Sequence, residues 1–238
     1  GPPFYHKLII PFLIPFLLIM AIGPKLKWIR SNFENKIYLI SLLIISILLS
    51  YLIVKNFEYN FLINSILISS ALYLFFMNLR DFFIHKSKNI SQNISHFGFS
   101  LLILSILFNN LFSTEIITNL KVGETFESSK TKIVFENVSK REGKNYESIV
   151  GNFNIQNSKG KIENFLPELR IYNQPNIVTS EADIKTTLIS DKFIVINLVQ
   201  NQDYFNIRYQ VKPFMIWIWF SVVLISFGGL ISLVKKRI

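Results

Sequence analysis

The chain has 238 residues, of which half are hydrophobic and 23 are Phe, and its formal net charge is +10. This exceeds what a water-soluble core needs, and the basic residues lie mainly between apolar runs, which disfavours nucleic-acid binding and points to a membrane protein. There is no cysteine, which excludes disulfides, thiolate metal sites and a thiol nucleophile. The first residue is Gly rather than Met, so we expect a fragment or a processed chain.

The first apolar run covers residues 8–22, contains Pro11 and Pro15, and stops at Gly23 and Pro24. Proline removes a backbone donor and should kink the helix, which a membrane protein tolerates when neighbouring helices or water satisfy the freed carbonyl groups. We expect a kinked membrane helix here.

Four further runs complete the predicted membrane region, at residues 37–54, 59–79, 94–112 and 213–234. The second and third are uncharged and long enough to cross the ~30 Å hydrocarbon layer at ~1.5 Å per residue. The last begins near Trp217 and Trp219, which suit an interfacial aromatic belt, and its Gly228-Gly229 pair permits close helix packing.

Basic residues in the short connections predict the orientation of these helices. With five spans, three basic clusters fall on one side of the membrane, whereas the opposite short connection offers only Lys55 beside Glu58. The positive-inside rule then places residues 113–212 outside. The clusters are Lys25, Lys27, Arg30 and Lys36; Arg80, Lys86 and Lys88; and Lys235, Lys236 and Arg237.

The outside segment has the pattern of β-structure. Apolar and polar residues alternate from Phe205 to Val211, and residues 131–138 and 192–199 are further β-branched runs. Turn sequences separate them at residues 142–145, 157–160 and 201–203.

The expected fold is therefore an integral membrane α-helical bundle of about five transmembrane helices with an inserted extracytoplasmic β-rich domain. Residues 1–112 hold four helices, residues 113–212 form the β-rich domain, and residues 213–238 form the final helix and a basic inner tail.

The three histidines are the main candidates for chemistry. His96 lies within the fourth predicted helix, where Gln92 and Ser100 share its face at i−4 and i+4. An ionisable residue inside a span indicates function, and imidazole is a common axial ligand of haem iron. A neutral His hydrogen-bonded to a neighbouring helix is the structural alternative. We interpret His6 as a polar residue at the outer interface and His85 as a solvated residue of an inner connection.

The sequence holds no His-Glu-x-x-His, no phosphate-binding glycine loop and no Gly-x-Ser-x-Gly, so its catalytic residues are unknown. In the outer domain, Arg170 and Arg208 are of the residue type that holds an acidic partner or a haem propionate. If their segment is extended, the neighbouring Glu181 and Asp183 flank one face of a strand, but we interpret them as a solvated pair in a loop.

Several stretches, in order along the chain, resemble the C-terminal part of the haem lyase of cytochrome c maturation, the CcmF family, and of its relative NrfE. They are Gly1–Tyr5, Ile22–Pro24, Ser95–Gly98, Lys121–Glu124, Arg141–Tyr146, Thr179–Ile184 and Val211–Trp219. The tryptophan-rich segment of that family and the outer histidines beside it are absent from this sequence. His6 stands where the family usually has Asn, so the resemblance gives it no ligand role.

The resemblance implies a C-terminal portion or split subunit of a cytochrome c haem lyase, incomplete as an enzyme alone. Such a complex receives haem from the carrier CcmE and forms thioether bonds to the reduced cysteines of apocytochrome c, and a CcmH-type thiol subunit is a further implied partner. It implies a transmembrane haem b between two histidines, reduced by quinol. His96 matches one of them, and the other belongs to an N-terminal CcmF portion.

The location implied is the bacterial or mitochondrial inner membrane, with the β-domain in the periplasm or intermembrane space and the C-terminus inside. A non-catalytic membrane scaffold whose outer domain binds a partner protein remains the alternative, with His96 structural. A transporter would require paired charges within spans and inverted repeats, and the sequence has neither.

Overall fold

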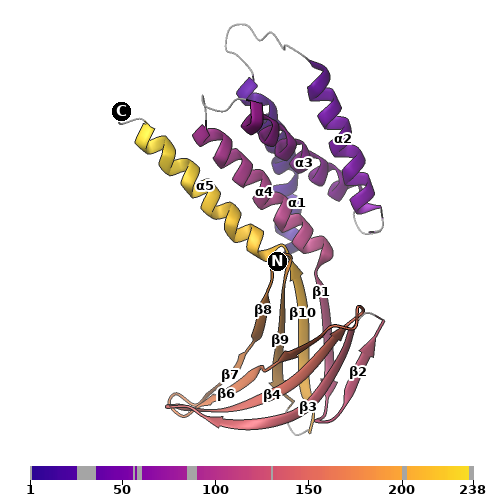
Figure 1. Cartoon of the computed structure of the whole chain (residues 1–238), viewed down its shortest axis with the longest axis vertical. Coiled ribbons are helices and arrows are strands. Elements are labelled where there is room, and N and C mark those ends of the chain that lie inside the picture. Colours follow the sequence, from indigo (N-terminus) through magenta and orange to yellow (C-terminus); the bar gives the residue numbers. More distant parts are fainter. Residues whose placement is uncertain are drawn as a thin grey trace. The chain divides into compact units, whose positions relative to one another are not determined.

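The structure is a computed structural model that describes residues 2–25, 36–55, 57, 61–84, 90–129, 131–199 and 203–235. The chain divides into two compact units, which are described separately. The first joins residues 1–110 to residues 217–238 and is helical, and the second, residues 111–216, is built of strands (Figure 1).

The described residues of the first unit form five α-helices. They are α1 (Pro2–Ile22), which continues into a 3-10 turn at Gly23–Lys25, α2 (Lys36–Val54), α3 (Phe61–Ile84), α4 (Ile90–Phe112) and α5 (Met215–Lys235). Within the described residues, α2, α3, α4 and α5 are long and apolar enough to cross a membrane, and the apolar part of α1, Leu8–Ile22, is shorter. The chain is a multi-pass membrane protein.

Several helix bounds differ from those expected. α1 begins at Pro2 instead of residue 8 and runs through Pro11 and Pro15. α3 begins at Phe61 and extends beyond residue 79 to Ile84, because a helix does not have to end where its apolar stretch ends. α4 begins at Ile90 instead of residue 94.

The basic clusters used to predict orientation lie mostly outside the described residues. Arg80, expected in a connection, belongs to α3. Its guanidinium lies 3.8 Å from the ring centroid of Tyr38 on α2 and 3.5 Å from the Asp81 carboxylate. A second contact between these helices is the hydrogen bond that the buried Ser50 hydroxyl donates to the Ser65 carbonyl oxygen, at 2.6 Å.

The second unit is a sandwich of two antiparallel sheets. One has the strand order β1-β10-β9-β8 and the other the order β2-β3-β4-β6-β7, with β5 paired to β4 (Figure 1). The strands are β1 (Thr114–Leu120), β2 (Thr125–Ser128), β3 (Thr131–Glu142), β4 (Tyr146–Asn157), β5 (Ile162–Phe165), β6 (Glu168–Tyr172), β7 (Ile177–Glu181), β8 (Asp183–Thr186), β9 (Ser190–Leu198) and β10 (Phe205–Pro213).

The core of the sandwich is apolar and aromatic, with residues from both sheets. Phe135 and Phe153 are fully buried and stack with ring centroids 4.3 Å apart, and Phe205 meets Phe135 edge-on. The members are Leu120, Ile133, Phe135, Phe153, Ile155, Phe165, Leu169, Ile194, Ile196, Ile207 and Tyr209. Because inward and outward residues alternate along each strand, one face of each sheet supplies this core.

The strand predictions agree with this sandwich, except at Gln210. The inward series from Phe205 to Val211 lies on β10, although Gln210 is also buried and donates a hydrogen bond to Glu115. The predicted turns after Glu142 and Asn157 join β3 to β4 and β4 to β5. The third predicted turn lies mostly outside the described residues.

Both connections to the membrane helices are short and lie at the same end of one sheet. β1 begins at Thr114, directly after α4, and β10 ends at Pro213, directly before α5. Thr114 pairs with Val211, so the two junctions lie on adjacent strands. Between β10 and α5, Phe214 has a φ of 62° and donates its N–H to the Ile189 carbonyl oxygen at 2.8 Å.

Candidate functional site

His96 lies on α4, six residues after the helix begins at Ile90, and is half-buried. The part of the chain that the structure describes offers its imidazole no hydrogen bond or ion pair. The ring nitrogens can therefore accept a partner from outside the described residues. This is an arrangement that suits an imidazole acting as a ligand.

Neighbours of His96 in sequence fix α4 against two other helices. Phe97 lies beside Phe75 of α3, with ring centroids 5.2 Å apart. Phe99 meets Phe16 of α1 edge-on at 5.9 Å. Aromatic contacts of this kind restrict the rotation of α4, and hence the direction in which His96 points.

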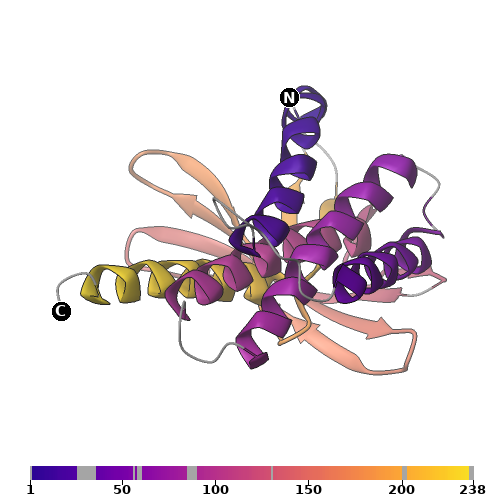
Figure 2. The same cartoon turned by 90° about the horizontal axis from the view of Figure 1, so that it is seen from above.

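A third helix, α5, packs closely on α4, and Figures 1 and 2 both show the two helices running alongside each other. The Ser91 hydroxyl donates a hydrogen bond to the Gly228 carbonyl oxygen at 2.7 Å, and the Ser95 hydroxyl lies 3.4 Å from the Ile225 carbonyl oxygen. A Cβ added to Gly228 would lie 2.8 Å from the Ser95 backbone nitrogen. The contact therefore requires glycine at this position.

Gly98 is the counterpart of Gly228 on α4. A Cβ added there would lie 3.0 Å from the Ile225 backbone nitrogen and from the Leu224 Cβ. The sequence indicated the Gly228-Gly229 pair, but the surface of α4 that receives it was not predicted. The signal was the series of small residues Ser91, Ser95 and Gly98, whose i, i+4, i+7 spacing puts them on one helix face.

The polar stripe predicted around His96 is only partly present. Ser100 is fully buried, but its hydroxyl donates to the Phe97 carbonyl oxygen of its own helix at 2.8 Å. Gln92 is half-buried. Ser100 is therefore a structural residue, and His96 remains the candidate for chemistry.

The other two histidines add no known ligand. His6, expected before the first helix, lies within α1, and its side chain is outside the described part of the structure, as is all of His85. Among the described residues, no group of three or more His, Asp or Glu side chains is arranged to hold a metal ion. His96 could supply one ligand to a metal held largely by another group, as in haem.

Another buried polar group lies on α3, which contacts α4. The Asn78 side chain is 5% exposed, and its amide nitrogen has no hydrogen-bond partner among the described residues. A buried donor without a partner is costly, so a group from elsewhere in the assembled protein or a water molecule would be stabilised there.

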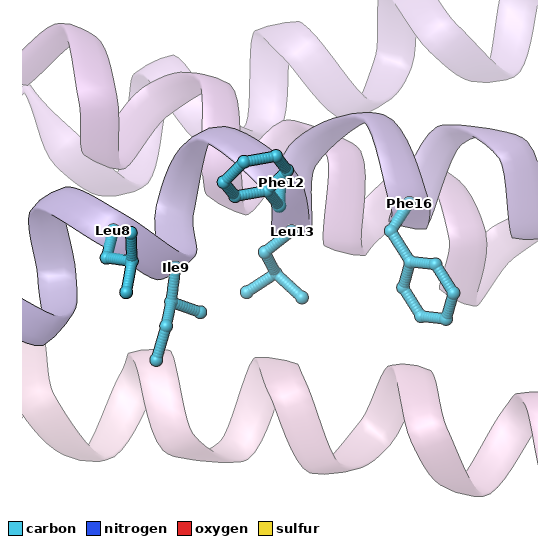
Figure 3. A pocket seen from close by; sticks show the side chains of 5 residues that line it. All are labelled: Leu8, Ile9, Phe12, Leu13 and Phe16. Carbon is cyan, nitrogen blue, oxygen red and sulfur yellow. The ribbon is translucent and has the colours of Figure 1, made fainter.

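An apolar hollow of about 560 Å³ follows one face of α1 (Figure 3). Five side chains line it, and none of them offers a hydrogen-bonding group that could orient a polar ligand. They are Leu8, Ile9, Phe12, Leu13 and Phe16. A lining of this kind suits acyl chains or another apolar helix.

The two arginines considered for an acidic ligand are paired with carboxylates of the sandwich domain itself. Arg170 donates to Glu168 at 3.1 Å, and this bond raises the pKa of the guanidinium. Arg208 donates to Glu115, and hydrogen bonds from Gln210 and Arg208 lower the pKa of that carboxyl. Each arginine therefore has an internal carboxylate partner.

The acidic pair expected in a solvated loop is also structural. Asp183 begins β8, and its carboxylate accepts a hydrogen bond from the Leu166 backbone N–H at 2.7 Å. Glu181 ends β7 and accepts a hydrogen bond from the Thr179 hydroxyl at 3.2 Å. The prediction of a solvated loop was wrong, because both residues lie in strands that pair within the sandwich.

A partly exposed ionic cluster links the two sheets near Tyr209. The Glu163 carboxylate lies 2.7 Å from the Lys192 ammonium and 3.0 Å from that of Lys161. Burial raises the pKa of Glu163, but the hydrogen bonds from Lys192 and Lys161 outweigh it, and the net effect is a lowered pKa. Burial, with the charge of Glu163, raises the pKa of Tyr209 to about 12.

Comparisons with known proteins agree with the fold of the chain. Residues 111–213 match the family described as the CcmF C-terminal beta-sandwich. The whole chain aligns with the cytochrome c-type biogenesis protein CcmF of Haemophilus influenzae at 27% identity, covering 39% of that protein. It also aligns over its whole length with CcmF of Escherichia coli at 25% identity and with NrfE of Haemophilus influenzae at 21%.

A solved structure named Cytochrome c Heme Lyase CcmF has the same fold. It matches 97% of this chain and 40% of its own length, with a TM-score of 0.70 at 21% identity. The family match covers the sandwich domain, and the whole chain is similar to CcmF-type proteins. It corresponds to the C-terminal part of CcmF-type proteins and spans about two fifths of the length of the curated relatives it matches.

Proposed function

We propose that this chain acts in cytochrome c biogenesis as the C-terminal portion of a CcmF-type haem lyase, with His96 as one axial ligand of a transmembrane haem b. The observation that carries this proposal is the place of His96 in the chain. It is a half-buried histidine in a membrane-spanning helix of a CcmF-type fold, with no hydrogen bond from the described residues.

His96 would be the residue that holds the haem iron from this chain, since a neutral imidazole is a frequent ligand of haem. α4 supplies His96, and the second ligand would come from an N-terminal CcmF portion. When bound, the haem would supply one-electron chemistry within the membrane.

The chain's own contribution to such a site is to hold and orient the imidazole. Phe97 and Phe99 pack α4 against α3 and α1, and Ser91 binds α4 to α5. Rigid helices keep a ligand within the small range of positions that metal coordination tolerates.

The proposal also includes the location of the chain and its partners. The sandwich domain would lie in the periplasm or intermembrane space and the C-terminus inside. Haem would also be the substrate, delivered by the carrier CcmE and joined to apocytochrome c by thioether bonds with a CcmH-type thiol subunit present, and quinol would reduce the haem b. The chain alone would be an incomplete enzyme, either a split subunit or part of a longer protein.

The test is the haem content of the chain purified after co-expression with an N-terminal CcmF portion. His96→Ala should remove the b-type haem absorption, and Gln92→Ala, on the same helix face, should keep it. Equal recovery of the original chain and the two variants in detergent, each with the N-terminal portion, would show that the variants assemble. Unchanged haem absorption in His96→Ala would contradict the ligand role and favour a non-catalytic membrane scaffold.

A further inference from the structure

The hairpin between β8 and β9 has an unusual turn. Leu188 and Ile189 form its centre, between Thr187 and Ser190, and their side chains are 72% and 70% exposed. Two-residue hairpin turns favour Gly, Asn and Asp, because these residues adopt the turn conformations at little cost. Two exposed aliphatic side chains at such a turn indicate a role other than folding.

Other hairpin turns of the same sandwich follow the usual polar pattern. The β3–β4 turn is Gly143-Lys144-Asn145, the β4–β5 turn contains Ser158, Lys159 and Gly160, and the β6–β7 turn is Asn173-Gln174-Pro175-Asn176. The apolar character of the β8–β9 turn is therefore specific to its position in the domain.

That position is next to the residues that lead into α5, as backbone pairing and chain connectivity show. The Phe214 backbone N–H donates to the Ile189 carbonyl oxygen at 2.8 Å, and Ser190 pairs with Pro213. α5, which spans the membrane, begins at the next residue, Met215. Trp219, a residue type of the membrane interface, is 68% exposed and lies only about 6 Å beyond Met215 along α5, at ~1.5 Å per residue.

The backbone of the turn is suited to an apolar surrounding. The Ser190 N–H donates to the Thr187 hydroxyl at 3.0 Å, and that hydroxyl donates to the Ser190 carbonyl oxygen at 2.8 Å. The Thr187 N–H also donates to the Ser190 carbonyl oxygen, and the Ile189 carbonyl oxygen accepts from Phe214. Backbone groups that are already paired lower the cost of leaving water.

We propose that the β8–β9 turn, Leu188 and Ile189, inserts into the lipid at the membrane surface where α5 begins. The two side chains bury their apolar surface among the acyl chains near the head groups, at the ~5–10 Å depth that interfacial segments reach. The turn thereby fixes the membrane-proximal edge of the sandwich domain relative to the bilayer.

The absence of cysteine from the sequence makes a direct test available, because one introduced cysteine gives one labelling site. Ile189→Cys and Leu188→Cys would carry an environment-sensitive fluorophore on the full chain in lipid nanodiscs. The matched controls are Leu198→Cys and Val122→Cys. These controls are 47% and 48% exposed and lie at the opposite end of the same sheet, about 26 Å away at ~3.3 Å per strand residue.

A nitroxide carried on the lipid should quench the probes at positions 188 and 189 several-fold more than the probes at the control positions. Iodide in the water should quench the control probes more than the probes at the turn. Equal iodide quenching at both ends would overturn the proposal. Exclusion of both quenchers from the turn would also overturn it, because the turn would then be covered by protein. Protease resistance of the sandwich in each labelled chain verifies that the domain is folded.

Discussion

The two units of the molecule bury different kinds of side chain where their elements meet. Close contacts between membrane helices use Ser91, Ser95 and Gly228, and Ser46, Ser50 and Ser221 are also buried in the helices. The sandwich instead buries rings such as Phe135 and Phe153. Large apolar residues are mostly exposed on α2 and α5, where lipid would cover them.

This difference follows from the solvent around each unit. In water, burying an aromatic ring removes apolar surface from solvent, so large side chains stabilise the sandwich. Between membrane helices that driving force is absent, because lipid tails are as apolar as Leu, and close approach with hydrogen bonds takes its place. We therefore expect the sandwich to lose stability when a buried side chain is made smaller. The helix contacts should lose stability when a small residue is made larger.

The largest expected effect comes from removing a ring from the sandwich core. Phe153 is fully buried and stacked on Phe135, so Phe153→Ala should lower the free energy of unfolding by about 3–5 kcal/mol. The measurement is the urea dependence of proteolysis of the sandwich in the full chain. Ile162→Ala is the control, because Ile162 is 61% exposed and its loss should cost within about 0.5 kcal/mol. Similar shifts for both variants would contradict an aromatic core.

The second effect comes from adding one methyl group between α4 and α5. In Gly228→Ala the new Cβ would lie 2.8 Å from the Ser95 backbone nitrogen and 2.9 Å from the Ser91 carbonyl oxygen. Overpacking of this kind costs about 1–3 kcal/mol. The measurement is thermal unfolding of the full chain in detergent.

Gly229→Ala provides the matched control for this change. A Cβ at Gly229 meets no atom within 4 Å, and alanine is the better helix former by about 0.5–1 kcal/mol. This variant should therefore be as stable as the original chain or slightly more stable. If both variants shifted the midpoint in the same direction, close packing at Gly228 would not determine the contact.

The helix bounds show what the sequence can and cannot predict. The uncharged run at residues 37–54 predicted α2 within one residue, because Lys36 lies directly before the first residue of the apolar stretch. The end of α3 was missed because Arg80 and Asp81 continue the helix beyond its apolar part. Backbone hydrogen bonding, and not hydropathy, decides where a helix ends.

Pairings between distant segments were beyond the sequence. The alternation from Phe205 to Val211 predicted β10, but its pairing with β1 and the burial of Gln210 beside Glu115 depend on residues about 95 positions away. Likewise, the sequence showed two adjacent glycines in α5, and only the structure shows that Gly228 meets α4 and Gly229 does not. His96 was found because an ionisable residue within an apolar run is visible locally.

The smallest expected effect concerns charge in the sandwich. The lowered pKa of Glu163 means that its ionised form is stabilised in the folded state. This stabilisation is complete above the carboxyl's ordinary pKa of 4.5 and is lost as the pH falls through the lower pKa of the folded state. Proteolysis of the sandwich in urea at pH values from 7 to about 3 measures the loss.

Glu163→Gln is the control for this pH dependence, since the amide cannot ionise. The original chain should lose more stability than this variant as the solution becomes acidic, and the two should converge at the lowest pH. An unchanged difference between them across the acidic range would show that Lys161 and Lys192 do not stabilise the ionised carboxylate.

The pairing of Thr114 with Val211 has a consequence for how the protein is built. The domain between α4 and α5 starts and finishes on neighbouring strands, so its two ends are as close together as those of a short loop. In topology, α4 and α5 form a helical hairpin, and the folded sandwich domain is the connection between the two helices. A few flexible residues could replace that domain without pulling the helices apart, and the domain could be transplanted between any two helix ends with the same spacing.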